Sequence, residues 1–316
     1  MRRCLLGMLL VMIPVSASTR RTTVLPDVRK PHQIVVDGGD LYVFDEADYS
    51  LHVYTLSPLT PKVTFGRKGD GPHDFKHLPY VFVQPDSLVC TDFTKIIWFS
   101  RKGEVLRAMP FSALQGFDIN SEMLLVPVGD RFLRITANHE TLKRYVDLMD
   151  STFTFIKTLY EGPFVWMRGS RTDYRTDTLT AGGLVFVADT FKGFHISVFD
   201  GTGTLLRTID RTADVEAVPD RARLHQFSVS DGRIYVTTYK RVDGKTEMII
   251  LDLQGRVLRR VFLPLTSIRP ERGPLRFDLF TVSGGKLYEL VQTAGNDTWE
   301  LVVTDLNAVP SPAREE

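Results

Sequence analysis

Cysteine is nearly absent from this chain of 316 residues, which contains Cys4 and Cys90 alone. Cys4 lies in an N-terminal apolar run that we expect to be removed, so the mature chain keeps one cysteine and has no internal disulfide. Cys90 lies in the strand-like segment SLVCTD, where a buried, unreactive thiol is expected. No Cys/His spacing typical of a zinc finger occurs.

An excess of charge of one sign is also missing, because Lys plus Arg number 39 and Asp plus Glu number 38. A balanced chain lacks the global attraction for nucleic acid that a strongly basic protein has, so we expect no nucleic-acid partner. The sequence also lacks HExxH, GxSxG and paired-carboxylate motifs. It therefore offers no direct support for an enzyme.

Long apolar runs are missing except at the N-terminus, where CLLGMLLVMIPV (Cys4 to Val15) follows Arg2 and Arg3. These 12 residues are fewer than the roughly 20 that span a membrane. With the small residues around Ala17, the pattern predicts a signal peptide over residues 1–17 and an exported protein, periplasmic or extracellular in a bacterium. A retained anchor is the alternative. We expect no transmembrane helix in the mature chain, and a monomer.

What is present is a repeat of strand, tight turn and strand, with β-branched and aromatic residues around a Gly, Asp, Pro or Ser turn. The six copies are IVVDGGDLYVFD (34–45), VFVQPDSLVCTD (81–92), LLVPVGDRFLRI (124–135), TLTAGGLVFVAD (178–189), FSVSDGRIYVTT (227–238) and LFTVSGGKLYEL (279–290). The first apolar residues after the turns lie 44 to 53 residues apart. Near-constant spacing indicates a repeat architecture.

A second hairpin follows the first in each unit, as in ISVFDGTGTLLRTI (196–209), and no segment has the period of an amphipathic helix. Six units of four strands predict an all-β, six-bladed β-propeller over residues 20–308. The expected blades are 34–66, 80–110, 123–160, 177–210, 226–263 and 278–306. Because the sixth unit lacks its last strand, we expect TTVL (22–25) to complete it and close the ring. Residues 309–316 form a polar tail, and two stacked sandwiches are the alternative fold.

The segment FGRKGDGPHDF (65–75), followed by VFVQPDSLVCTD, resembles exported bacterial six-bladed propellers with NHL-like repeats. The matching loop residues are Phe65, Gly66, Gly69, Gly71, Pro72 and Phe75. Asp45, Asp92 and Asp189 match the acid that ends a strand in that family, whereas units three, five and six lack it. The resemblance implies the fold more than a function.

The glycine-rich loop does not have the pattern of a phosphate-binding loop, which needs a helix N-terminus behind it. It connects the outer strand of one unit to the inner strand of the next. We interpret its glycines as positive-φ turn residues, with ligand contact as the alternative.

The connections from outer to inner strands are rich in arginine, whose planar guanidinium suits carboxylate, sulfate or phosphate groups. An aromatic side chain beside them could stack on a sugar ring. We therefore predict that this face binds an anionic or carbohydrate-like ligand or a protein partner. The candidate residues are Arg67, Trp166, Arg168, Arg171, Arg175 and Arg276. The alternative is that these arginines pair with nearby carboxylates.

Two further hypotheses belong to other classes of protein. His32, His225 and Asp278 come from units one, five and six, which are neighbours in a closed ring, and two imidazoles with a carboxylate could hold a divalent metal. Such a site at the mouth of the channel would indicate a metal-dependent lyase or hydrolase. A structural subunit of a cell-envelope assembly is the other alternative, and an apolar patch on a side of the molecule would favour it.

Overall fold

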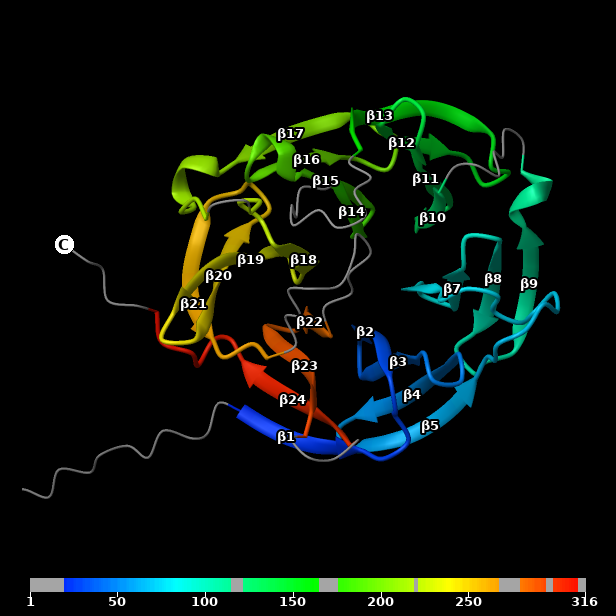
Figure 1. Cartoon of the computed structure of the whole chain (residues 1–316), viewed down its shortest axis with the longest axis horizontal. Coiled ribbons are helices and arrows are strands. Elements are labelled where there is room, and N and C mark those ends of the chain that lie inside the picture. The colour runs from blue at the N-terminus through cyan, green and yellow to red at the C-terminus, as the bar shows by residue number, and fades with distance from the viewer. Residues whose placement is uncertain are drawn as a thin grey trace, which may run out of the picture.

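The computed structural model describes residues 20–114, 122–164, 176–218, 221–266, 279–293 and 298–311. These residues form six four-stranded antiparallel sheets, arranged as blades around a central axis (Figure 1). The protein is thus a six-bladed β-propeller, as the repeat predicts. The helical structure within the described ranges consists of three short 3₁₀ turns, η1 (Phe111–Ala113), η2 (Thr190–Lys192) and η3 (Thr212–Asp214). No helix in those ranges is long and apolar enough to cross a membrane.

Each blade runs from an inner strand at the axis to an outer strand at the rim. Blades 1 to 3 are β2 (Pro31–Asp37), β3 (Asp40–Asp45), β4 (Ser50–Leu56) and β5 (Leu59–Phe65); β6 (Tyr80–Val83), β7 (Ser87–Thr91), β8 (Lys95–Ser100) and β9 (Val105–Pro110); and β10 (Glu122–Val128), β11 (Arg131–Asn138), β12 (Lys143–Met149) and β13 (Phe155–Pro163). Blades 4 to 6 are β14 (Thr176–Ala181), β15 (Leu184–Asp189), β16 (His195–Phe199) and β17 (Leu205–Asp210); β18 (Gln226–Ser230), β19 (Arg233–Val242), β20 (Lys245–Asp252) and β21 (Val257–Leu263); and β22 (Phe280–Ser283), β23 (Lys286–Gln292), β24 (Trp299–Asp305) and β1 (Arg20–Leu25).

The N-terminal strand closes the ring, as the segment TTVL predicts. β1 pairs antiparallel with β24, with Leu25 opposite Trp299 and Arg20 opposite Thr304. The last blade is therefore built from both ends of the propeller. This closure leaves no blade with a missing strand and ties the first blade to the last.

The core lies between the blades, where the apolar face of one sheet packs on the next. Between blades 4 and 5, the buried cluster includes Phe186, Ile196, Phe227 and Ile249. Cys90 is 1% exposed in the cluster between blades 1 and 2, and burial raises the pKa of its thiol. The prediction of a buried cysteine is confirmed, and a protonated, inaccessible thiol is a poor nucleophile.

The outer strands of blades 2 to 5 begin with a β-bulge. In blade 4, for example, Phe199 pairs with Leu205 and Val198 pairs with Arg207, so Leu206 is the extra residue. The bulges leave apolar side chains exposed at the rim, because they insert an extra residue into an edge strand. This outer belt consists of Leu106, Phe155, Ile156, Leu205, Leu206, Val257 and Leu258.

Candidate functional site

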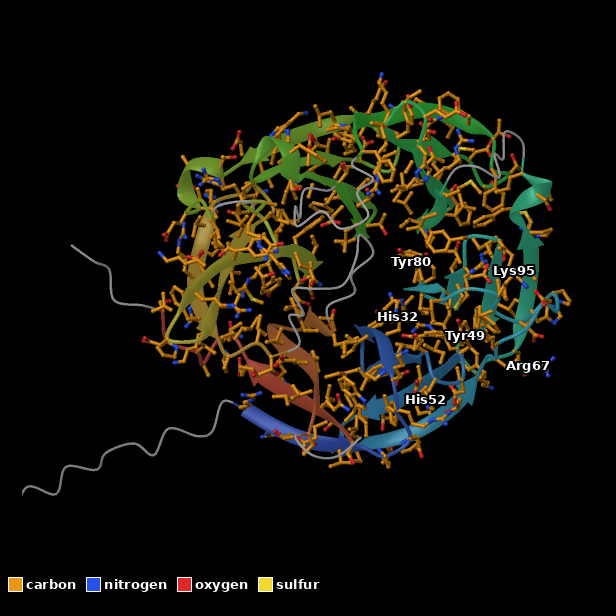
Figure 2. All side chains as sticks on the ribbon, viewed as in Figure 1. His32, Tyr49, His52, Arg67, Tyr80 and Lys95 are labelled. Carbon is orange, nitrogen blue, oxygen red and sulfur yellow. The ribbon has the colours of Figure 1, made fainter. Side chains whose placement is uncertain are left out.

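The blades surround a central cavity of about 1040 Å³, lined by residues of all six inner strands. The cavity runs along these strands from their first residues to the hairpin turns at their ends. Figure 2 shows Tyr80 near the central opening and Arg67 at the outer rim. A cavity of this size, enclosed by rigid strands, is the feature of the described chain that best suits a small ligand.

Charge is sparse on the described part of the cavity wall. Arg144 is its single cation, and Asp37, Asp177 and Asp231 are its acids. Asp37 forms an ion pair with Arg101 at 2.8 Å, and Asp231 accepts a hydrogen bond from Ser230 at 2.7 Å. The rest of the lining combines apolar side chains with hydroxyl and amide groups.

Two glutamines occupy the same place in different blades but differ in their contacts. Gln33 of β2 donates from Nε2 to the Val81 carbonyl at 3.0 Å and accepts from the Val81 N–H at 2.8 Å. Its amide thereby joins the inner strands of blades 1 and 2 as a strand backbone would. Gln226 begins β18 in the corresponding place, and its buried Oε1 has no hydrogen-bond partner.

The inner strand of blade 4 differs from the other five in the face that it turns toward the preceding blade. At the fourth residue before the two-residue hairpin turn, the other blades have Ile34, Val81, Leu125, Phe227 and Phe280, all buried in the interblade clusters. Blade 4 has Thr178 there, between Thr176 and Thr180. These three residues pair with Asp189, Val187 and Val185 and lie on one face, since side chains alternate along a strand. The threonine row lines the cavity beside Arg144.

Most of the arginines predicted to bind a ligand lie outside the described residues. These are Arg168, Arg171, Arg175 and Arg276, together with Trp166. Arg67 is described: its Nε donates to Asp74 at 2.7 Å, and its side chain is 78% exposed. The ion pair with Asp74 matches the alternative that these arginines pair with nearby carboxylates, but most of the Arg67 side chain remains exposed. The ligand-binding role predicted for Arg67 therefore stays a prediction. The hydrogen bond to Asp74 raises the pKa of Arg67, which remains a cation.

Of the three glycines in the loop, only Gly66 has the positive φ that we expected. Gly66 has φ of +94°, as expected, and a Cβ there would lie 2.9 Å from Cε2 of the buried Phe75. Gly69 and Gly71 do not have positive φ, so the interpretation is wrong for these two. A Cβ on them would lie 2.4 and 2.7 Å from Oδ2 of Asp74. Their missing side chains therefore make room for the carboxylate that binds Arg67.

The metal ligands predicted from the sequence are only partly described. Asp278 lies outside the described residues. His225 is 1% exposed, with Nδ1 3.3 Å from Thr237 Oγ1 and its ring edge-on to Tyr239. The ring of His32 lies edge-on to Phe44. The metal site stays a prediction, which metal analysis of the protein and of His225→Ala can test.

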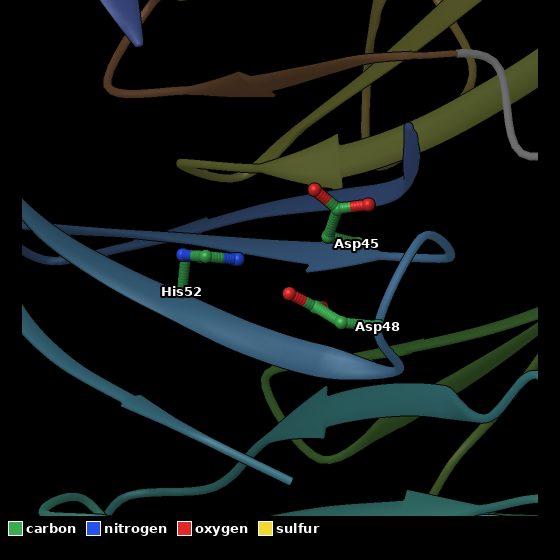
Figure 3. Close-up of side chains that lie close together, drawn as sticks. All are labelled: Asp45, Asp48 and His52. Carbon is green, nitrogen blue, oxygen red and sulfur yellow. The ribbon is translucent and has the colours of Figure 1, made fainter. Parts of the chain in front are cut away.

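Another group could offer metal ligands by proximity, namely Asp45, Asp48 and His52 between β3 and β4 (Figure 3). Its atoms already have protein partners: Ser50 Oγ lies 2.5 Å from Asp48 Oδ1 and 2.9 Å from His52 Nε2. Burial raises the pKa of Asp48, but hydrogen bonds from Ser50 and Arg29 outweigh it and lower the net value. The acid contacts the serine rather than the imidazole, and Ser50 is 5% exposed, so the group is not a catalytic triad.

The acids that end the second strands have a structural role in the described blades. Asp45 is 0% exposed and accepts hydrogen bonds from the N–H groups of Arg29, Lys30 and Ala47. Asp92 accepts from Lys76 N at 2.8 Å and from Thr94 Oγ1 at 2.7 Å. Each carboxylate thus fastens the connection that enters its blade to the next turn within it.

These features define a six-bladed propeller with a central cavity, and solved structures share the propeller architecture. The chain is similar to a candidate exported protein of Bacteroides fragilis (13% identity, TM-score 0.55, 92% of this chain and 97% of that one). It is also similar to a DUF4221-family protein of Bacteroides vulgatus (10%, 0.59, 90% and 96%) and to a luciferin-regenerating enzyme (13%, 0.52, 93% and 98%). No protein-family model and no curated protein matches the sequence. At these identities, the similarities show the fold alone.

The sequence reasoning missed the threonine row. A signal for it is present in TDTLTA (176–181), where threonine recurs at every second position. At the positions of Thr178 and Thr180 the other inner strands carry apolar residues, so an alignment of the six units would reveal the substitution. Arg144 was missed because it belongs to a third strand, β12, whereas the predicted ligand-binding residues lie in the connections between blades.

Proposed function

We propose that the protein is an exported binding protein whose ligand, an anionic or carbohydrate-like small molecule, enters the central channel of the propeller. The observation that carries this proposal is the cavity of about 1040 Å³ enclosed by the six inner strands. Arg144 and the threonine row on its wall support a ligand with anionic and hydroxyl groups. The arginine-rich connections in the sequence support entry from the face on which they lie.

Two observations support export. The sequence begins with a basic, then apolar segment of the kind that directs secretion. The resemblance to exported NHL-like propellers and the similarity to a candidate exported protein point the same way. Fractionation of the producing cells, with a cytoplasmic marker as control, tests this part of the proposal; recovery of the protein with that marker would contradict it.

Ligand binding can be tested with a variant that narrows the cavity. Ser228 lines the cavity and Leu206 lies on the outer belt, 47% exposed, so Ser228→Trp places a large side chain in the cavity whereas Leu206→Trp adds the same side chain outside it. A thermal-shift screen of oligosaccharides, uronic acids and small organic anions should find compounds that stabilise the wild type and Leu206→Trp but not Ser228→Trp. The proposal fails if no compound distinguishes the two variants.

A second function, that of a scaffold subunit in a cell-envelope assembly, is favoured by the outer belt. Its exposed apolar side chains recur on four consecutive blades, and such patches commonly mark protein contacts. Leu206→Ser and Leu258→Ser together should abolish recovery of partners from envelope extracts while leaving ligand-induced stabilisation intact. Equal recovery by the wild type and the double variant would contradict this role.

A further inference from the structure

The cavity extends sideways between blades 3 and 4. Apart from residues of inner strands and their turns, its described lining includes Phe93 from the turn between β7 and β8 of blade 2, and Ile135 and Ala137 of β11 and Arg144 of β12 from blade 3. Across the ladder Arg144 pairs with Ala137, and Ile135 pairs with Val146 of the cluster between blades 3 and 4. These side chains therefore face blade 4, and the cavity reaches the third strand of this one blade.

The opposite wall of this recess is the threonine row of blade 4. Its members lack the bulk that the corresponding Phe227 brings to blade 5. Asp177 pairs with Ala188, which belongs to the cluster between blades 4 and 5, so this carboxylate lies on the far face of β14. The recess thus has an aliphatic wall on blade 3 and a hydroxyl-bearing wall on blade 4.

The three threonines differ in their hydrogen bonds. Thr180 Oγ1 donates to the Pro127 carbonyl at 3.0 Å, and Thr176 Oγ1 donates to the hydroxyl of Tyr160 at 3.4 Å. Burial raises the pKa of Tyr160 to about 12, so this phenol is neutral. Thr178 Oγ1, between them, is buried and has no hydrogen-bond partner. A buried hydroxyl without a partner is costly, and because Oγ1 is closed off from solvent, Thr178 lines the cavity with its other atoms.

Arg144 is held in place at the end of the recess. Its Nη1 donates to the Thr176 carbonyl at 2.9 Å, which links the guanidinium to blade 4. Its guanidinium carbon lies 5.2 Å from the centre of the Phe164 ring. A guanidinium fixed by a carbonyl and an aromatic face is preorganised for a carboxylate, which its planar fork matches.

We propose that the recess between blades 3 and 4 binds a small organic carboxylate. The carboxylate contacts Arg144, and the carbon skeleton lies against Leu124, Ile135 and Ala137. This inference rests on the proposed function, because the recess is reached through the channel. It adds the chemical class of the ligand and the place where its charge is recognised.

Cysteine labelling tests the recess without knowledge of the natural ligand. In a Cys4→Ser background, Thr178→Cys places a thiol in the recess, and Ser228→Cys places one elsewhere on the cavity wall. Cys90 is 1% exposed and should not react. The probes are the anionic 2-sulfonatoethyl and the cationic 2-trimethylammonioethyl methanethiosulfonates, whose labelling rates are followed by mass spectrometry.

The ratio of anionic to cationic labelling rates should be about fivefold higher at Thr178→Cys than at Ser228→Cys, because the guanidinium attracts the sulfonate. Arg144→Gln should remove this difference and Arg144→Lys should keep most of it, with thermal unfolding of both variants as a check on folding. Benzoate should slow labelling of Thr178→Cys but not of Ser228→Cys, whereas benzamide should slow neither.

The outcomes separate the two proposals. If Ser228→Cys reacts and Thr178→Cys does not, the recess is closed and this inference fails while channel binding stands. If neither reacts, the channel is inaccessible and both fail. Equal rate ratios at the two thiols, or no protection by benzoate, would show that the recess does not recognise a carboxylate.

Discussion

The interface between blades 4 and 5 and the interface between blades 3 and 4 have the same strand geometry but different contents. Phe227 fills the former, within a cluster that includes Phe186, Ile196 and Ile249. At the same register of blade 4, Thr178 faces blade 3 and leaves a buried hydroxyl beside the cavity. Because the closed ring holds both interfaces in place, the interface between blades 3 and 4 can have less apolar packing at its inner end. We infer that the exception among six equivalent positions reflects function rather than stability.

The largest effect that would distinguish the interfaces is on stability. Phe227→Ala removes a large side chain that is 6% exposed and should lower the free energy of unfolding by about 3–5 kcal/mol. Thr178→Ala should change it by less than about 1 kcal/mol, since the hydroxyl has no partner to lose. Urea unfolding followed by circular dichroism measures both, with Leu206→Ala as an exposed control. Equal losses at the two positions would show that the two interfaces depend equally on the side chain at this register.

The two glutamines extend the comparison to other pairs of blades. Gln33→Ala leaves the N–H and carbonyl of Val81 without their side-chain partner and should cost about 2–3 kcal/mol. Gln226→Ala removes an amide whose buried Oε1 has no partner and should cost less than about 1 kcal/mol. The same urea titration measures the pair. A cost for Gln226 as large as that for Gln33 would show that burial, rather than the hydrogen bonds to Val81, sets the effect.

A smaller effect should separate two neighbours in the threonine row. Thr180→Val removes the hydrogen bond to the Pro127 carbonyl and should lower the free energy of unfolding by about 1 kcal/mol. Thr178→Val keeps the shape and removes an unpartnered hydroxyl, so it should be neutral or stabilising by up to about 1 kcal/mol. Thermal unfolding of the two variants provides the measurement. If Thr178→Val is the more destabilising, its hydroxyl has a partner in the folded protein.

The fold could be predicted from the sequence because it repeats. Six hairpins at near-constant spacing identify the blades, and the missing last strand of the sixth unit identifies β1 as the closing strand. Both inferences depend on local patterns, namely turn residues and period-two alternation. A repeated unit supplies each of these signals six times, so an ambiguous copy is corrected by the others.

The candidate site was harder to predict because it depends on contacts between units. The bond from Arg144 to the Thr176 carbonyl joins side chain and backbone 32 residues apart in the sequence. The role of Gly69 and Gly71 was misjudged for a similar reason, because the carboxylate of Asp74 folds back over them. Strand patterns fix which face a residue occupies, but not what fills the space opposite.

At their outer ends the two interfaces should behave alike, and the smallest predicted effect tests this. The turn of blade 4 at Asp200 and the turn of blade 5 at Asp252 each pack a glycine on the preceding blade, where a Cβ on Gly203 or Gly255 would lie 2.5 Å from Leu159 or 2.7 Å from Ile209. Thr202 Oγ1 donates to Asp200 Oδ1 at 2.6 Å, and this bond is the main cause of the lowered pKa of Asp200. At Asp252, burial raises the pKa, but hydrogen bonds from Arg256 outweigh it and lower the net value.

Because the pKa of Asp200 is lower in the folded than in the unfolded protein, its contribution to stability is present above its ordinary pKa of 3.8 and is lost as the pH falls through the folded value. Thr202→Val should raise the pKa of Asp200 toward 3.8 and leave that of Asp252 unchanged. Carboxyl carbon chemical shifts followed by NMR between about pH 2 and 6, a range that brackets ordinary aspartate values, measure both groups. Arg256→Gln should give the reciprocal result, raising the pKa of Asp252 alone. A shift of both groups in either variant would mean that the two turns are coupled through blade 4, and the outer ends could then no longer be treated as independent copies of one design.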